Sequence, residues 1–184
     1  MSSVERAINI QQLMETSGVR FGTSGARGLA VHMTSEVCFA YTLAFLQAVP
    51  AKSGRVALAM DLRPSSPRIA AACAAAIKAA GLRVDWCGAI PTPALALFAQ
   101  TQPIPAVMIT GSHIPFDRNG IKFYRADGEI DKADEAAITA ALPASPEAHP
   151  DPARHAPASP VRRTWRRHSP VVQPACADRG RRRR

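Results

Sequence analysis

The fold is decided by residues 55–86, which read RVALAMDLRPSSPRIAAACAAAIKAAGLRVDW. Arg55–Met60 opens this stretch as a short apolar run, typical of a buried strand. A helix is predicted in the middle of this stretch, because two serines followed by Pro67 suit its start. It stops at Gly81, a residue type that commonly ends helices. Residues 82–86 alternate between apolar and polar side chains, as a second strand does. A strand, a helix and a strand in this order predict a parallel pair in an α/β sheet.

The segments on either side continue the alternation of strands and helices. The further predicted strands are Val19–Thr23, which opens into a glycine-rich turn, Pro105–Thr110 and Gly120–Tyr124. The further predicted helices run from Thr34 to about Val49, from Thr92 to about Gln100 and from Asp131 through Leu142, with Thr34 and Asp131 as caps. We therefore expect an α/β domain over residues 1–144, with a mixed, mostly parallel sheet sandwiched by helices.

The composition changes abruptly after Pro143. Residues 1–144 hold 13 Lys or Arg and 11 Asp or Glu, whereas residues 145–184 hold ten Arg, three acidic residues and seven prolines. The net charge of +9 therefore resides mainly in the last 40 residues, and it does not mark the domain as a specific nucleic-acid binder. A segment without Leu, Ile, Phe or Met cannot bury enough apolar surface to fold, so a disordered basic tail is predicted. Its composition also resembles an out-of-frame translation of GC-rich sequence.

Deleting residues 145–184 should leave the thermal unfolding of residues 1–144 nearly unchanged, because a disordered tail contributes no packing. Any binding of the tail to polyanions should be weak and should fade with added salt, since it would rest on phosphate contacts. Calorimetry of the full and shortened chains checks the first expectation. A drop of several degrees on deletion would contradict it.

The cysteines and the apolar runs indicate a cytoplasmic protein. Cys38, Cys73, Cys87 and Cys176 show no CxxC spacing and no paired framework, so reduced thiols are predicted, the first three in the core. No apolar run is long enough to span a bilayer, and residues 1–15 are too polar for a secretory signal peptide. We expect no membrane partner.

Three loops carry residue types suited to phosphate chemistry. The first is FGTSGARG at residues 21–28, whose glycines can present backbone N–H groups to an anion beside Arg27, although such a stretch is often only a turn. The second is DLRPSSP at residues 61–67, between a strand and a helix. There, Ser65 and Ser66 are interpreted as parts of a capping loop that holds an Asp61–Arg63 pair, and a ligand role for Arg63 stays open.

The third loop, TGSHIP at residues 110–115, is the most informative. Ser112 follows a buried strand on a turn shaped by glycine and proline, where a hydroxyl would be exposed and oriented as a nucleophile or phosphate carrier requires. His113 is adjacent, and Lys122 lies on the next predicted strand, able to point back. A plain turn serine is the alternative interpretation for Ser112 alone.

Taken together, these loops and the NGIKFY segment at residues 119–124 resemble, in order and spacing, the first domain of the α-D-phosphohexomutases. This family contains phosphomannomutase and phosphoglucomutase, and the resemblance covers roughly residues 18–142. The TGSH form of the third loop is closer to the phosphomannomutase/phosphoglucomutase branch than to the phosphoglucosamine mutases, which tend to have TASH.

The resemblance implies a catalytic set of Ser112, His113, Lys122 and Arg27. Ser112 would carry the phosphoryl group, Arg27 and Lys122 would stabilise the charge of that group and help move the hydroxyl proton, and His113 would orient the phosphoserine. The implied cofactor is Mg²⁺, for which Ser112 is the only ligand carried over. Ile114 departs from the family, which usually has Asn there, and it removes a hydrogen-bonding amide.

Two functional hypotheses follow from the resemblance. The first is a phosphomannomutase-type enzyme domain that moves phosphate between positions 6 and 1 of a hexose phosphate, with hexose phosphate and hexose 1,6-bisphosphate as ligands; a phosphoglucomutase is the alternative within this class. The second is a truncated or frame-shifted, non-catalytic remnant, because the family's three further domains, which supply the Mg²⁺ loop, sugar recognition and the distal phosphate site, have no counterpart here. Asp127–Asp131 is interpreted as a turn plus a helix cap rather than a metal loop.

Overall fold

The computed structural model describes residues 7–22 and 24–143, so the disordered tail predicted for residues 145–184 lies outside the described residues. The helices are α1 (Ile10–Ser17), α2 (Ser35–Ala48), α3 (Ser66–Ala79), α4 (Thr92–Thr101) and α5 (Lys132–Ala140). The strands are β1 (Arg20–Phe21), β2 (Gly25–Leu29), β3 (Arg55–Met60), β4 (Arg83–Ala89), β5 (Ala106–Ile109), β6 (Arg118–Arg125) and β7 (Gly128–Glu129). Within the described part of the chain, no helix is both long and apolar enough to cross a bilayer.

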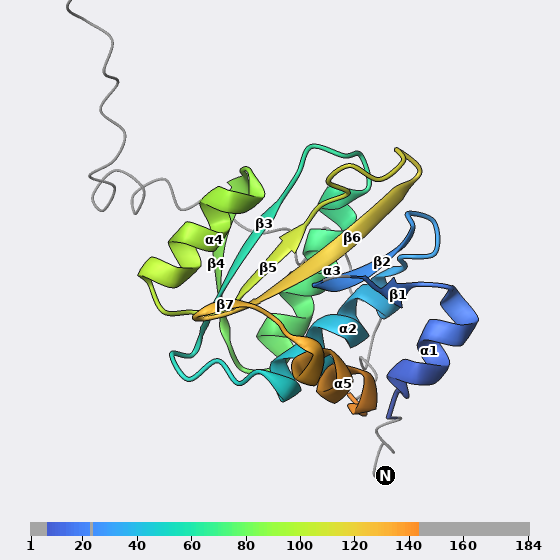
Figure 1. Cartoon of the computed structure of the whole chain (residues 1–184), viewed down its shortest axis with the longest axis horizontal. Helices are drawn as coiled ribbons and strands as arrows, with labels where there is room; N and C mark the ends of the chain where they lie inside the picture. The colour runs from blue at the N-terminus through green and yellow to red at the C-terminus, as the bar shows by residue number, and fades with distance from the viewer. Residues whose placement is uncertain (1–6, 23, 144–184) are drawn as a thin grey trace, which may run out of the picture.

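One mixed sheet joins all the strands in the order β1-β2-β6-β5-β3-β4, with β7 paired to β6 (Figure 1). The pairs β3–β4 and β3–β5 are parallel because α3 and α4 return the chain to the same end of the sheet. β6 follows β5 through a loop without a helix, and it pairs antiparallel with β5, β2 and β7. The predicted mixed α/β sheet is confirmed, with its parallel part in β5, β3 and β4.

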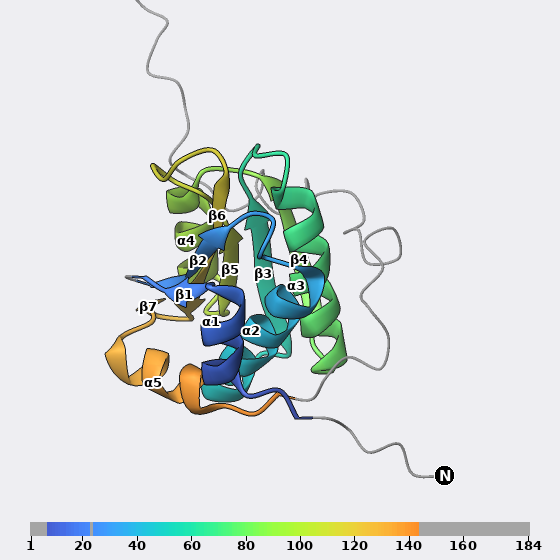
Figure 2. The same cartoon turned by 90° about the vertical axis from the view of Figure 1, so that its right-hand side faces the viewer.

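Helices cover both faces of this sheet, as predicted (Figure 2). α2 and α3 pack on one face, and α1 and α5 pack beside α2. α4 lies alone on the other face, against β3 and β5. The strands alternate accordingly: Val56 and Leu58 belong to the core under α2 and α3, whereas Ala57 and Ala59 belong to the core under α4. A single helix cannot cover all of that second face, so β2, β6 and β7 remain partly open there.

The helix starts show which local predictions hold. Thr34 caps α2 by accepting from the Val37 N–H at 3.2 Å, and Asp131 caps α5 by accepting from the backbone of Ala133 and Asp134. Ser65 occupies the N-cap position of α3, as the two serines before Pro67 suggested, but its backbone is already in the helical region and its hydroxyl makes no cap bond. The N-terminal helix α1 and the strands β2 and β7 were not predicted.

Three of the four cysteines lie in the described region. Cys38, Cys73 and Cys87 are buried and free, as predicted. Burial raises the pKa of each thiol, to about 12 for Cys73 and for Cys87. These thiols therefore remain protonated and serve as small apolar groups in the core.

Candidate active site

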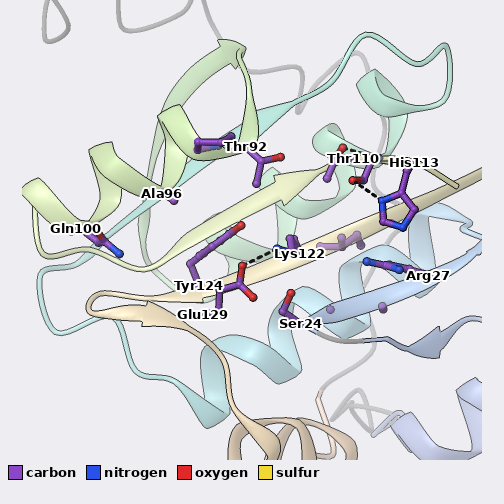
Figure 3. Close-up of a pocket in the computed structure, with 16 residues that line it drawn as sticks. Ser24, Arg27, Thr92, Ala96, Gln100, Thr110, His113, Lys122, Tyr124 and Glu129 are labelled. Atoms are coloured by element: carbon purple, nitrogen blue, oxygen red, sulfur yellow. Dashed lines mark hydrogen bonds and ion pairs between the residues drawn. The ribbon is translucent and has the colours of Figure 1, made fainter. Parts of the chain in front are cut away.

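A cleft of about 730 Å³ opens on the face of the sheet that α4 covers only in part (Figure 3). One side of α4, from Thr92 to Gln100, lines it together with β2, β6, β7 and the loop after β5. Arg27, Ser112, His113 and Lys122 are all among the lining residues. The structure therefore brings together the four residues that the sequence pointed to, from three separate segments.

The register of β6 explains why these segments meet. Lys122 on β6 pairs with Gly25 of β2 on one side and with Met108 of β5 on the other. The strand that carries Lys122 thus lies between the strand of Arg27 and the strand that leads to Ser112. Alternation along β6 turns Lys122 toward the cleft, while Ile121 and Phe123 enter the core on the opposite face.

Two glycines allow the central strands to approach this closely. A Cβ atom on Gly25 would overlap the carbonyl oxygen of Ile121 and would lie 2.8 Å from the Lys122 Cα. A Cβ atom on Gly120 would lie 3.1 Å from the carbonyl oxygens of Ala26 and Thr110. Gly25, one of the glycines that suggested a phosphate-binding turn in the sequence, therefore also serves strand pairing.

Ser112 is exposed at the end of the cleft and has an unusual backbone. Its φ is +49°, the only positive φ of a non-glycine residue in the described part of the chain. Its N–H donates to the Thr110 Oγ1 at 2.9 Å, and its Oγ lies 3.2 Å from the His113 Nδ1, within hydrogen-bonding distance. A left-handed backbone costs free energy for any residue with a Cβ, so the surroundings must hold this conformation.

Lys122 is paired within the cleft with an acid that the sequence reasoning missed. Its Nζ donates to the Glu129 Oε1 at 2.6 Å and lies 5.4 Å from the centre of the Tyr124 ring. Burial lowers the pKa of Lys122, but the hydrogen bonds to Glu129 and Tyr124 outweigh it and leave the pKa raised. The same hydrogen bond lowers the pKa of Glu129. Lys122 is therefore a permanent positive charge near neutral pH.

The signal for Glu129 was present in the sequence. The Asp-Gly pair at residues 127–128 is a typical hairpin signal; in the structure Ala126 and Asp127 form the turn, which sets Gly128 opposite Arg125 and Glu129 opposite Tyr124. Ser24 was also missed. Its hydroxyl lies in the wall of the cleft, buried and without a hydrogen-bond partner among the described residues.

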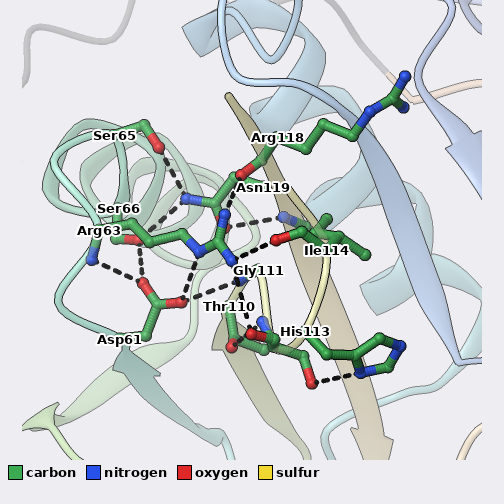
Figure 4. A network of polar contacts seen from close by, with 12 residues as sticks. Asp61, Arg63, Ser65, Ser66, Thr110, Gly111, His113, Ile114, Arg118 and Asn119 are labelled. Carbon is green, nitrogen blue, oxygen red and sulfur yellow. Dashed lines mark hydrogen bonds and ion pairs between the residues drawn. The ribbon is translucent and has the colours of Figure 1, made fainter. Parts of the chain in front are cut away.

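The sequence left open whether Arg63 binds a ligand. In the structure it lies behind the Ser112 loop rather than in the cleft (Figure 4). Its guanidinium donates to the carbonyl oxygens of Ile114, Pro115 and Arg118 at 2.7–2.8 Å. The expected pair with Asp61 is confirmed, with the Arg63 Nε 3.6 Å from the Asp61 Oδ2.

Asp61 connects three segments behind the loop. It accepts from the backbone N–H groups of Arg63 and Gly111 and from the Ser66 hydroxyl. Burial raises the pKa of Asp61, but these hydrogen bonds outweigh it and leave the pKa lowered, so the group stays a carboxylate. Asn119, buried and not anticipated from the sequence, donates to the Ser65 and Ser66 hydroxyls at 2.8 and 2.9 Å. The two serines thus join α3 to β6.

The described residues do not form a metal site by themselves. Among residues 7–22 and 24–143, no group of three or more His, Cys, Asp or Glu side chains is placed to hold an ion. Glu129 is bound to Lys122, and both oxygens of Asp61 accept hydrogen bonds. Asp127 lies in a turn and Asp131 caps α5, as predicted, but Gly128 and Glu129 between them form β7. A metal-ligand role for Ser112 stays a prediction.

Comparison with known proteins places this architecture in a family. Residues 18–149 match the family model described as phosphoglucomutase/phosphomannomutase, alpha/beta/alpha domain I. The chain is 53% identical over 132 residues to a phosphomannomutase of Salmonella muenchen, and 39% identical over 145 residues to a phosphoglucosamine mutase of Streptococcus suis. The solved structure of a candidate phosphomannomutase from Thermus thermophilus is similar, with a TM-score of 0.63 and 28% identity.

These matches cover most of this chain and a smaller part of each relative. They span 71% of the chain and 28% of the Salmonella protein, 73% and 31% for the Streptococcus protein, and 72% and 32% for the Thermus structure. The sequence, the fold and the cleft agree with the family match. The chain therefore belongs to the phosphoglucomutase/phosphomannomutase family and contains its α/β/α domain I.

Proposed function

We propose that this chain is the phosphoserine domain of a phosphomannomutase-type phosphohexomutase, which moves phosphate between positions 6 and 1 of a hexose phosphate. The observation that carries the proposal is the convergence of Ser112, His113, Arg27 and Lys122 on one cleft. An exposed hydroxyl next to an imidazole and two cationic side chains suits the transfer of a dianionic phosphoryl group.

The half-reaction proposed for this domain transfers a phosphoryl group from a hexose 1,6-bisphosphate to Ser112. The Ser112 Oγ attacks phosphorus, and the bond from phosphorus to the sugar oxygen breaks with its electron pair on that oxygen. The hydroxyl proton of Ser112 passes through the His113 Nδ1, 3.2 Å away, and ends on the sugar oxygen. The products are phosphoserine and a hexose monophosphate, and the reverse step returns the phosphate to the other position.

Lys122 and Arg27 supply charge rather than a proton in this scheme. The hydrogen bond to Glu129 keeps the pKa of Lys122 raised, so its ammonium is a poor proton carrier near neutral pH and a stable partner for phosphate oxygens. Arg27 faces the same cleft, and a guanidinium remains charged at any pH of interest. In this proposal the two side chains act by electrostatic stabilisation, and His113 carries the hydroxyl proton.

The proposed cofactor is Mg²⁺, held with the help of the serine oxygen and of ligands beyond this domain. The described residues do not complete such a site by themselves. The mannose preference is proposed from the relatives: two phosphomannomutases are 53% and 52% identical to this chain, whereas the phosphoglucosamine mutases reach 39–40%.

Incubating the full chain with hexose 1,6-bisphosphate and Mg²⁺ should place phosphate on Ser112 and on no other serine. Ser24, Ser65 and Ser66 are buried or engaged in the network with Asn119, so none competes as an exposed nucleophile. Intact mass and peptide mapping measure the product, with Ser112→Ala as the blank and Ser65→Ala as the matched control that should label normally. Stoichiometric phosphate on another serine, or labelling that survives in Ser112→Ala, would refute the proposal.

A further inference from the structure

We infer that Arg63 is the positioning residue of the phosphate-accepting loop: its guanidinium holds residues 112–118 so that the Ser112 hydroxyl is presented to the cleft. The inference rests on the proposed role of Ser112, which it deepens. Arg63 does not line the cleft, and it acts through the backbone of the loop rather than on the ligand.

Within the described part of the chain, the hydrogen bonds of the guanidinium go to carbonyl groups of residues 112–118. Its Nη1 donates to the carbonyl oxygens of Pro115 at 2.7 Å and Arg118 at 2.8 Å, and its Nη2 donates to that of Ile114 at 2.7 Å. A longer contact of 3.5 Å joins Nη2 to the Ser112 carbonyl oxygen. Four carbonyl groups therefore converge on one side chain, as Figure 4 shows.

These hydrogen bonds fix the conformation of a loop that apolar packing does not hold. Every residue from Ser112 to Arg118 is exposed except Ile114, which is partly exposed, so no apolar core fixes the loop. The strained φ of Ser112 must then be maintained by its anchored neighbours. Gly111 is tied to Asp61 on one side, and the residues after Ser112 are tied to Arg63 on the other.

The loop and the guanidinium are matched in shape. A Cβ atom on Gly111 would overlap the guanidinium carbon of Arg63, so only glycine leaves room for the side chain at its observed place. The planar fork of Arg63 also reaches acceptors that are spread along the loop, whereas the single nitrogen of a lysine cannot reach them together. Asp61 holds the fork from behind through the 3.6 Å pair with Nε.

Two substitutions that displace the fork in different ways test the inference in the full chain. Arg63→Lys keeps the charge and removes the spread of donors, and Gly111→Ala keeps Arg63 and takes its space. The matched control is Arg68→Lys. Its guanidinium also donates to backbone carbonyls, those of Met33 and Ala30, but it does not contact residues 112–118.

The first readout is the single-turnover phosphorylation of Ser112 by hexose 1,6-bisphosphate. We expect both variants to lower the maximal rate roughly 10²-fold, the size of effect that a misplacement of about 1 Å produces. The half-saturating bisphosphate concentration should stay within about twofold, because no cleft residue changes. The double variant should be little slower than the slower single variant, since both remove the same contact. Arg68→Lys should keep the wild-type rate.

The second readout is amide hydrogen exchange at Gly111, Ser112 and Ile114, whose N–H groups donate to the Asp61 carboxylate, the Thr110 Oγ1 and the Gly111 carbonyl oxygen, respectively. Exchange should accelerate there in Arg63→Lys and Gly111→Ala, and it should not change in Arg68→Lys. Wild-type exchange and wild-type rate in Arg63→Lys would overturn the inference. If the wild-type chain takes no phosphate at Ser112, the proposed function fails instead, and exchange alone then decides whether Arg63 holds the loop.

Discussion

A coupled assay of the purified 184-residue chain is expected to record no turnover of mannose or glucose phosphates above the Ser112→Ala blank. A mutase cycle needs two opposite phosphoryl transfers, and between them the bisphosphate must turn over and be gripped by its non-reacting phosphate. Such positioning supplies up to roughly 7–11 kcal/mol of barrier reduction in well-oriented systems. The chain matches only 28% of its Salmonella relative, and the cleft is lined from one side by a single domain.

The described residues also lack a complete set of ligands for a metal ion. Without a group of acidic ligands in the described residues, charge neutralisation at a phosphorylated Ser112 falls to Arg27 and Lys122 alone. The phosphorylation test of Ser112 serves as the positive control, since it asks for one transfer and not for a cycle. Turnover at a rate typical of an enzyme would contradict this expectation, and it would require a second copy or a separate chain to complete the cleft.

The largest loss of stability from a single substitution is expected for Gly25→Ala. The added methyl group would overlap the Ile121 carbonyl oxygen, which belongs to the backbone of β6 and cannot rotate away as a side chain would. This overlap can be removed only if β2 moves away from β6, the strand that carries Lys122. We expect a loss of about 3 kcal/mol in the free energy of unfolding, which corresponds to a fall of roughly 10 °C in Tm for a domain of this size.

Gly128→Ala is the matched control for this substitution. Gly128 also lies in a strand paired with β6, it has no positive φ, and a Cβ atom there meets nothing within 4 Å. Its replacement should shift Tm by no more than about 2 °C. Equal melting temperatures for Gly25→Ala and the wild type would mean that β2 and β6 are not packed as closely as described.

The parts of the fold that could be predicted from the sequence are those set by local chemistry. The apolar run of β3 is predictable because a covered strand needs apolar side chains on both faces, and its bounds match residue for residue. The caps at Thr34 and Asp131 are predictable because a short oxygen-bearing side chain satisfies N–H groups within its own first turn. The turn at Ser112 followed from the glycine and proline around it.

The parts that escaped prediction depend on partners far along the chain. β2 contains two glycines in five residues and shows no strand pattern, and it is a strand because β6 pairs with it. The role of Arg63 could not be read from DLRPSSP, because its acceptors are carbonyl groups about 50 residues away, which every residue type possesses. The partner of the Ser65 hydroxyl could not be read from the sequence either, because Asn119 lies on β6, more than 50 residues away.

The register that places Lys122 between the strands of Arg27 and Ser112 also bears on the order in which a newly made chain acquires its parts. The β3-α3-β4-α4-β5 unit is built from neighbours in sequence, so it can form while synthesis is still under way. β2 leaves the ribosome early and has no partner for its open edge until β6 follows. Loop closure across almost the whole domain must then bring the two together. We therefore expect the cleft to form late in synthesis, and a chain interrupted before residue 118 would lack the strand that carries Lys122.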